Sequence, residues 1–133
     1  MAGLAAYGTT LTGTACGLIA NVVSIDGPSL SLDTVDVTAH DSADAWEEIV
    51  PTILRSGEMT LELNYDPTDA SHAFAAGLLH YLTSRLIDTW TVGGPMGAWS
   101  FDGYVTAFSP SAPHDGKLGA SVTIKPTTTV TIP

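Results

Sequence analysis

The sequence has 133 residues with 14 acidic and 4 basic side chains, a formal net charge of −10, and 44% hydrophobic residues. A disordered acidic tail would combine such a charge with low hydrophobicity, so we expect one folded domain over residues 1–133. Four cationic side chains are too few to neutralise a run of phosphates or to hold an anionic membrane, which excludes nucleic-acid binding and membrane docking. Lone Cys16 excludes an internal disulfide, and no stretch reaches the roughly 20 apolar residues of a membrane span.

Strand-like patterns dominate the first half of the chain. The apolar run over residues 18–25 predicts a strand, which the turn-forming residues 26–28 close. From Ser29 apolar and polar residues alternate, but this pattern shifts by one position between Leu32 and Val35, and such a shift predicts a β-bulge. Over residues 57–65 apolar and polar residues alternate without interruption, so this strand is expected to bury one face and expose the other.

One helix is predicted in mid-chain, over residues 66–84. Asp66 is a suitable N-cap and Pro67 fits the first helical position. Apolar side chains then recur every four residues, which predicts an amphipathic helix of about four turns. These apolar positions are Ala70, Phe74, Leu78 and Leu82.

Three further strands are predicted over residues 86–92, 99–108 and 118–124. Residues 1–17 precede the first strand and are expected to form an N-terminal arm. Residues 126–133 are strand-like with little to anchor them, so this C-terminal arm either pairs with a neighbouring subunit or frays. The fold class that follows is mainly β: an antiparallel β-sandwich or barrel with one flanking α-helix and a long inter-strand loop.

The long loop, residues 39–56, is the feature that a minimal domain does not need. Loops of this length are uncommon in compact domains, and this one is too apolar for a disordered linker. Its apolar side chains either fold back over the sheet of their own subunit or form a patch that a second subunit buries. They are Trp46, Ile49, Val50, Ile53 and Leu54.

The sequence offers little support for catalysis. His72 and His80 lie eight residues apart, not at the four-residue spacing that brings two imidazoles to one metal ion. The pairs His40-Asp41 and His114-Asp115 resemble a base with its orienting acid, but such dipeptides are common by chance. We therefore expect no enzyme activity, no catalytic residue, no metal site and no cofactor.

Exposed aromatic side chains suggest an alternative. Trp90 and Trp99 either belong to the core or form a platform on which a sugar ring could stack. A carbohydrate-binding adhesion module is therefore the alternative function from a different class.

Residues 18–67 resemble the major tail tube proteins of long, non-contractile-tailed bacteriophages and of related tail-like particles. The later strands, WSFDGYVTAFSP and KLGASVTIKPT, extend this similarity to about Thr127. The motifs that carry it are Val35-Asp36-Val37-Thr38, His40-Asp41-Ser42, Trp46-Glu47-Glu48, Ser56-Gly57-Glu58 and Asn64-Tyr65-Asp66-Pro67.

The resemblance implies hexameric rings of this chain, stacked into a hollow tube through which DNA passes without specific binding. It also implies a tape measure protein, a tail terminator and distal tail proteins as partners, with assembly in the host cytoplasm. A tail terminator or joining protein of related fold is a second alternative. In this family the long loop reaches the adjacent ring, so Trp46, Ile49, Val50, Ile53 and Leu54 become candidates for contact between rings. Among acids on polar strand faces, the expected lumen residues are Asp33, Asp36 and Glu62.

Overall fold

The computed structural model describes residues 7–41, 43–73 and 76–133. Its strands form two antiparallel sheets, one of seven strands in the order β2-β1-β7-β8-β9-β6-β3 and one of two strands, β4 and β5. The strands are β1 Thr10–Gly13, β2 Gly17–Leu18, β3 Val22–Asp26, β4 Leu30–Asp36, β5 Ile49–Ser56, β6 Met59–Asn64, β7 Ile87–Gly93, β8 Trp99–Ser111 and β9 Gly119–Thr131. The described residues also form helix α1, Leu78–Thr83, and a 3₁₀ turn, Ala43–Ala45. The predicted antiparallel, mainly β fold class is confirmed.

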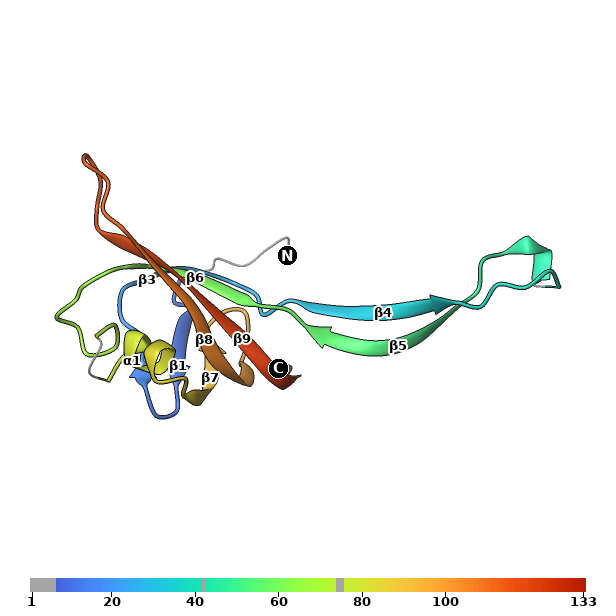
Figure 1. Cartoon of the computed structure of the whole chain (residues 1–133), viewed down its shortest axis with the longest axis horizontal. Helices are drawn as coiled ribbons and strands as arrows, with labels where there is room; N and C mark the ends of the chain where they lie inside the picture. Colours follow the sequence, from blue (N-terminus) through green and yellow to red (C-terminus); the bar gives the residue numbers. More distant parts are fainter. Residues whose placement is uncertain (1–6, 42, 74–75) are drawn as a thin grey trace.

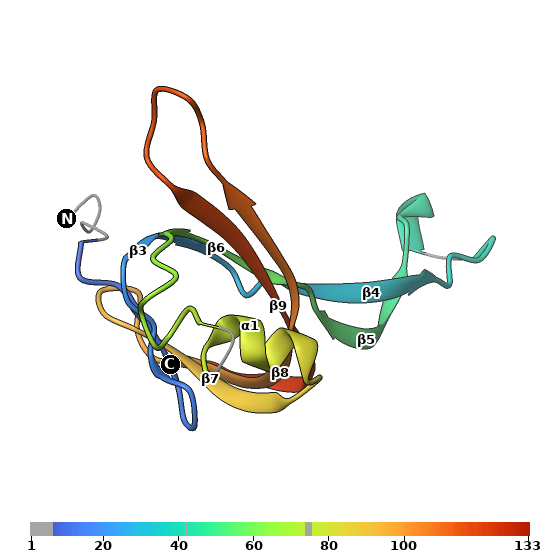
Figure 2. The same ribbon diagram turned by 60° about the vertical axis from the view of Figure 1, so that its left-hand side comes forward.

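The molecule consists of a body and a projecting hairpin arm (Figure 1). The body contains the seven-stranded sheet and α1, and the hairpin arm is residues 30–56, that is β4, the turn after it and β5. The sheet curves so that β3 and β6 face β7 across a core on which α1 packs (Figure 2). Within the described residues, no helix has the length and apolar character needed to cross a membrane.

The core of the body follows from alternation along the strands. Met59, Leu61 and Leu63 of β6 are buried while the residues between them are exposed, as the sequence predicts. At the centre lies Trp90 of β7, which is fully buried and donates from its indole N–H to the carbonyl of Gly103, 3.1 Å away. Buried aliphatic side chains from β1, β8 and β9 complete this single core.

The predicted helix over 66–84 is wrong in extent, because α1 covers only Leu78–Thr83. The preceding segment is held in turns by its own polar side chains, which compete with helical hydrogen bonds. Asp66 accepts the N–H of Thr68 and Asp69 accepts that of Ser71. Phe74, one of the predicted apolar positions, lies outside the described residues.

Neither predicted terminal arm is free over its described length. Within residues 1–17, Thr10–Gly13 forms β1, which pairs with β7 and buries Leu11 completely. The C-terminal segment continues β9 to Thr131 and pairs with β8, with Val130 opposite Phe101. The sequence predicts little to anchor this tail, but Val130 is buried and anchors it.

The predicted loop over 39–56 is half strand, since β5 occupies Ile49–Ser56 and pairs with β4. The strand predicted over 18–25 is likewise divided into β2 and β3, with Asn21 between them at a φ of 62°. The two strands that flank the predicted loop, β4 and β6, do not pair with each other, because β6 pairs with β3 and β4 pairs with β5. The hairpin arm extends the antiparallel pairing of β3 with β6 beyond the body.

Candidate functional site

The hairpin arm leaves the body at a narrow neck formed by two glycines. The N–H of Gly57 donates to the carbonyl of Ser29 at 2.7 Å, which joins the two strands of the neck. Gly27 has a φ of +97°, and a Cβ at this position would lie 3.0 Å from the carbonyl oxygen of Glu58. Both the backbone conformation and the close approach therefore favour glycine where the hairpin arm begins.

Apolar side chains lie on both faces of the hairpin arm. Leu32 pairs with Leu54 and Val35 pairs with Val50, and each pair shares one face of the ribbon. Because Leu32 and Val35 are three residues apart in β4, the two pairs lie on opposite faces. The register does shift between Leu32 and Thr34, as the predicted bulge requires, but the extra residue belongs to β5 rather than to β4.

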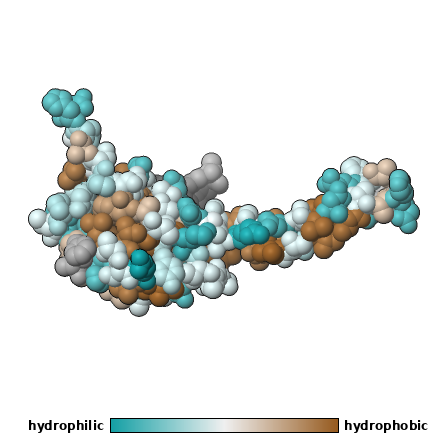
Figure 3. Space-filling view, in the orientation of Figure 1, coloured by the Kyte–Doolittle hydropathy of each residue, from teal (hydrophilic) through white to brown (hydrophobic). Residues whose placement is uncertain are grey.

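These apolar side chains are uncovered. Leu54 is 79% exposed and Trp46 is 73% exposed, and Figure 3 shows apolar surface along the hairpin arm. Large apolar patches on a soluble domain mark sites where another molecule binds. The other large hydrophobic residues exposed on β4 and β5 are Leu30, Leu32, Val35, Ile49, Val50 and Ile53.

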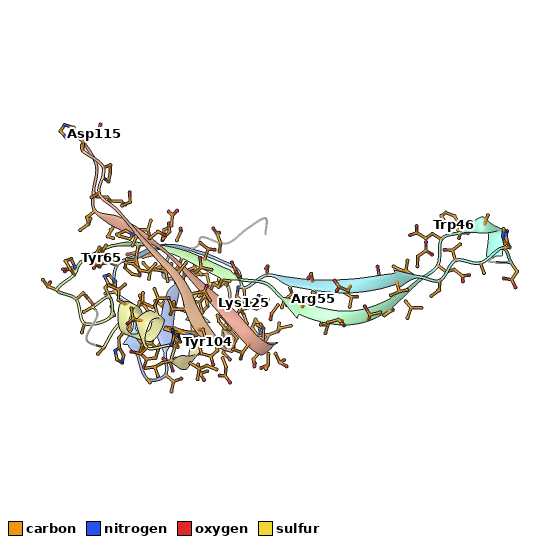
Figure 4. The ribbon with its side chains drawn as sticks, in the orientation of Figure 1. Trp46, Arg55, Tyr65, Tyr104, Asp115 and Lys125 are labelled. Atoms are coloured by element: carbon orange, nitrogen blue, oxygen red, sulfur yellow. The ribbon has the colours of Figure 1, made fainter. Side chains whose placement is uncertain are left out.

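The five residues predicted to contact another subunit all lie on this surface. Ile49, Val50, Ile53 and Leu54 belong to β5, and Trp46 lies just before it near the tip (Figure 4). Of the two alternatives open in the sequence, folding back over the subunit's own sheet is wrong, because all five side chains are exposed. Sequence reasoning missed Leu30, Leu32 and Val35 of β4, although apolar residues at both parities of one strand were the available signal.

The tip of the hairpin arm is ordered by a small polar network. Asp36 accepts the N–H of Thr38 at 2.8 Å, and the Thr38 hydroxyl accepts the N–H of Glu48 at 2.7 Å. The hydrogen bonds from Thr38 lower the pKa of the Asp36 carboxyl below its ordinary value. Four further acids, and no lysine or arginine, lie between residues 39 and 48: Asp41, Asp44, Glu47 and Glu48.

The three acids predicted to line a lumen do not share one surface. Asp33 lies on β4, where it forms an ion pair with Arg55 of β5, and Asp36 ends the same strand. Glu62 instead lies on the exposed face of β6, in the body. Other polar residues extend that face of the seven-stranded sheet: Asp102, Thr106, Ser121, Lys125 and Thr127.

The structure does not assemble the sugar-binding platform considered from the sequence. Trp90 is fully buried in the core. Trp99 is half-buried, and its indole N–H donates to the carbonyl of Met96 at 3.0 Å. The two indoles therefore cannot present a shared stacking surface.

His72 has a structural role in the body. His72 is fully buried, where its Nδ1 accepts the N–H of Asp66 at 3.2 Å and its Nε2 lies 2.7 Å from the carbonyl of Ala20. This pattern requires the neutral ring with its proton on Nε2. Among residues 7–41, 43–73 and 76–133, no three histidines, cysteines or acids gather in a way that could hold a metal ion.

One buried carboxylate organises the turn between β1 and β2. Asp88 accepts the N–H groups of Ala15 and Cys16 at 3.1 Å and 3.0 Å. Burial, together with the charge of Asp88, raises the pKa of the Cys16 thiol to about 11. A thiol with this pKa is almost entirely protonated at neutral pH, so Cys16 is a poor nucleophile.

Comparisons with known proteins find the fold but no close sequence relative. No protein family matches the sequence, and no curated protein sequence matches it. A chain in the virion of a native gene transfer agent particle is similar in structure, with a TM-score of 0.78 and 14% identity over 96% of this chain and 97% of that chain. A chain of the extracellular contractile injection system PVC, in its sheath/tube terminator, has a TM-score of 0.73 and 14% identity over 98% and 96%.

A further solved structure, Hcp1 from Flavobacterium johnsoniae, has a TM-score of 0.53 and 16% identity, with 89% of each chain covered. Identities this low show the fold alone. The likeness to a gene transfer agent chain includes nearly the whole length of both proteins, so it is not confined to the body. The resemblance to tail tube proteins that the sequence suggested is thus confirmed at the level of fold.

Proposed function

We propose that the chain is a structural subunit of a phage-type tail tube, built from stacked hexameric rings whose acidic lumen conducts DNA during ejection. The observation that carries the proposal is the hairpin arm, which exposes on both faces apolar side chains that the described part of its own subunit leaves uncovered. The fold similarity to a chain of a gene transfer agent virion supports the same role. Location in the tail of a virion or tail-like particle follows, with tape measure, tail terminator and distal tail proteins as partners.

The hairpin arm supplies a physical reason for assembly. An isolated two-stranded ribbon is marginally stable in water, and burial of apolar surface contributes about 25 cal/mol per Å². Contact with another subunit would bury Trp46, Ile49, Val50, Ile53 and Leu54 and would stabilise the ribbon at the same time. The contact proposed for these five residues is between adjacent rings.

Simple geometry is compatible with a hexameric ring around DNA. If six subunits each supplied four strands, roughly 24 strands at about 4.8 Å spacing and about 40° tilt would close into a wall some 48 Å across. Subtracting side chains leaves a bore of roughly 35 to 40 Å, which is wide enough for duplex DNA.

For the lumen we propose the exposed polar face of the seven-stranded sheet, which carries the acids Glu62 and Asp102 and the cation Lys125 beside hydroxyl side chains. An acidic, hydroxyl-rich wall repels phosphates and offers DNA no adhesive site. Asp33 and Asp36 belong to the hairpin arm, so they line the bore only where that arm does. The positive charge of Arg55, which forms an ion pair with Asp33, also offsets most of the negative potential of the Asp33 carboxylate.

Electron microscopy of the concentrated protein tests the proposal. We expect hollow polymers of ring-like repeats, and we expect Trp46→Ala to fold normally while the polymers shorten or disappear. A protein that stays monomeric at high concentration, and that no tail-like particle contains, would contradict the proposal.

A tail terminator is the second candidate, because chains from the PVC sheath/tube terminator and from the cap of the anti-feeding prophage have TM-scores of 0.73 and 0.71 with this chain. A terminator closes a tube instead of extending it. Single rings without stacks in the same micrographs would favour this role, whereas long tubes favour the tube subunit.

A further inference from the structure

Three aspartate–glycine pairs occur in the chain, beginning at Asp26, Asp102 and Asp115, and the fold gives them different surroundings. In such a pair the glycine nitrogen can attack the side-chain carboxyl carbon of the aspartate, and glycine has no Cβ to hinder the approach. The rate of an intramolecular attack depends on how readily the two atoms reach the right orientation. The structure around each pair therefore decides whether the pair reacts.

Asp102 and Gly103 lie within β8, in the middle of the seven-stranded sheet. The Asp102 carboxylate accepts the Thr89 hydroxyl at 2.6 Å, and the carbonyl of the buried Gly103 accepts the indole N–H of Trp90. Attack would require the glycine nitrogen to turn toward the aspartate side chain, at a ψ far from the roughly +135° of an antiparallel strand. The strand and its hydrogen bonds therefore hold this pair in an unreactive geometry.

Asp26 and Gly27 lie where β3 ends and the neck of the hairpin arm begins. Asp26 pairs with Thr60 of β6. The Gly27 backbone is packed so closely that a Cβ there would lie 3.0 Å from the carbonyl oxygen of Glu58 and 3.3 Å from Cα of Met59. Because a rotation between Asp26 and Gly27 would disrupt this packing, the second pair is also held in place.

Asp115 and Gly116 lie in the turn that joins β8 to β9, at the tip of a hairpin that projects from the body (Figure 4). Both residues are exposed and neither belongs to a strand. Within residues 7–41, 43–73 and 76–133, no hydrogen bond or ion pair holds the Asp115 carboxylate. The Gly116 N–H donates to the carbonyl of Pro113 at 3.4 Å, which is longer than a strong hydrogen bond. Since exposed loop tips are more mobile than the strands they join, this pair can reach the reactive orientation.

We propose that Asp115 and Gly116 form a site of spontaneous covalent modification, at which aspartate converts to isoaspartate while the other two pairs stay intact. The Gly116 nitrogen forms a bond to Cγ of Asp115, and the nitrogen's proton leaves with the carboxyl hydroxyl as water, which closes a succinimide ring. Water then adds to one of the two ring carbonyls. Addition at Cγ restores aspartate, whereas addition at the main-chain carbonyl gives isoaspartate, so the conversion needs no oxidant and no other reactant.

The modified turn keeps its charge but changes its length. In isoaspartate the main chain runs through Cβ and Cγ of residue 115, which adds one carbon atom, and the freed main-chain carboxylate carries the negative charge. The pairing of β8 with β9 ends at Ser111 and Gly119, so residues 112–118 can absorb the extra atom without a change of register. This inference does not depend on the proposed function, and the failure of either leaves the other standing.

Storage of the folded protein at neutral pH and physiological temperature tests the proposal, with peptide mapping against synthetic isoaspartyl standards as the measurement. Isoaspartate should form at Asp115 at least about ten-fold faster than at Asp26 or Asp102, because orientation governs the attack. In guanidinium chloride, where strands no longer constrain the chain, the three rates should agree within about three-fold. Equal rates in the folded protein, or a difference that persists after unfolding, would overturn the inference.

Asp115→Ser is the matched variant, since it removes the reacting carboxyl from an exposed turn and should leave the thermal unfolding midpoint unchanged. Gly116 is kept because a Cβ there would lie 2.8 Å from Cγ of Pro113. An isoaspartyl methyltransferase, which transfers the methyl group of S-adenosylmethionine to the freed carboxylate, gives a second readout. We expect it to label the stored protein but not stored Asp115→Ser. Equal labelling of the two proteins would place the modification elsewhere and overturn the inference.

Discussion

Strand β6 of the body and the two strands of the hairpin arm have a similar share of apolar residues, but they place these residues differently. In β6 of the body, alternate residues are buried, and the apolar set points into one core. In β4 and β5 nearly every residue is exposed, and apolar side chains lie on both faces. A body strand therefore completes its contacts within the subunit, whereas the strands of the hairpin arm need another chain to cover them. The number of apolar residues does not distinguish a strand of the body from a strand of the hairpin arm. Their distribution does, because they lie on one face of the strand in the body and on both faces in the hairpin arm.

The largest expected difference concerns two tryptophans. Trp90→Ala should lower the free energy of unfolding by about 3–5 kcal/mol, because it empties the centre of the core and removes the hydrogen bond to Gly103. Trp46→Ala should change it by about 0.5 kcal/mol or less, since its side chain is mostly exposed in the subunit. Urea unfolding of both monomeric variants measures the contrast, and a strongly destabilised Trp46→Ala would mean that the hairpin arm belongs to the folding core.

A second test concerns the buried histidine of the body. His72→Leu should lower the free energy of unfolding by about 2 kcal/mol, since it leaves the partly buried N–H of Asp66 and carbonyl of Ala20 without their partner. Thermal unfolding should show the loss, while exchange of the amide protons in β4 and β5 should stay unchanged. Faster exchange throughout the hairpin arm would show that the two regions are coupled more tightly than their contacts indicate.

The sequence predicted the body better than it predicted the hairpin arm, for a physical reason. Alternation over residues 57–65 identified a half-buried strand, and β6 follows it. The apolar residues of 39–56 were recognised as needing cover, but β5 was missed because a strand that is apolar on both faces lacks the period-two signal. The helix was overestimated because its apolar spacing outweighed the turn-forming side chains of Asp66 and Asp69.

The sequence predicted part of the candidate site. All five predicted contact residues lie on the hairpin arm, since exposed apolar residues in a long connection are informative without any knowledge of pairing. The three acids predicted for the lumen, Asp33, Asp36 and Glu62, lie in two different regions of the structure. The sequence could not separate them, because the polar face of a strand in the body looks the same in sequence as that of a strand in the hairpin arm.

A smaller effect is expected at the carboxylate that holds the β1–β2 turn. Asp88→Asn should destabilise the body by about 2 kcal/mol, because an amide accepts the N–H groups of Ala15 and Cys16 less strongly than a charged carboxylate. It should also lower the pKa of the Cys16 thiol from about 11, since the negative charge of Asp88 is the second cause of that value after burial. Alkylation at pH 9 should therefore be faster in Asp88→Asn, with Cys16→Ser as the unreactive control. An unchanged rate would assign the raised pKa to burial alone.

The smallest effects compare the same hydrogen-bonded turn in the two regions. Asp36 in the hairpin arm and Asp66 in the body each accept hydrogen bonds from the side chain and from the N–H of the threonine two positions later, Thr38 and Thr68. The side-chain hydrogen bond, which alanine lacks, is the larger cause that lowers the pKa of each carboxyl. A carboxyl with a lowered pKa in the folded state stabilises that state above its unfolded pKa, and the contribution is lost as pH falls through the folded pKa. In carboxyl NMR titrations, Thr38→Ala should raise the pKa of Asp36 and leave that of Asp66 unchanged, and Thr68→Ala should do the reverse. Because Asp36 belongs to the uncovered ribbon, acid should loosen the tip of the hairpin arm while the core around Trp90 stays folded, and simultaneous loss of both would contradict their independence.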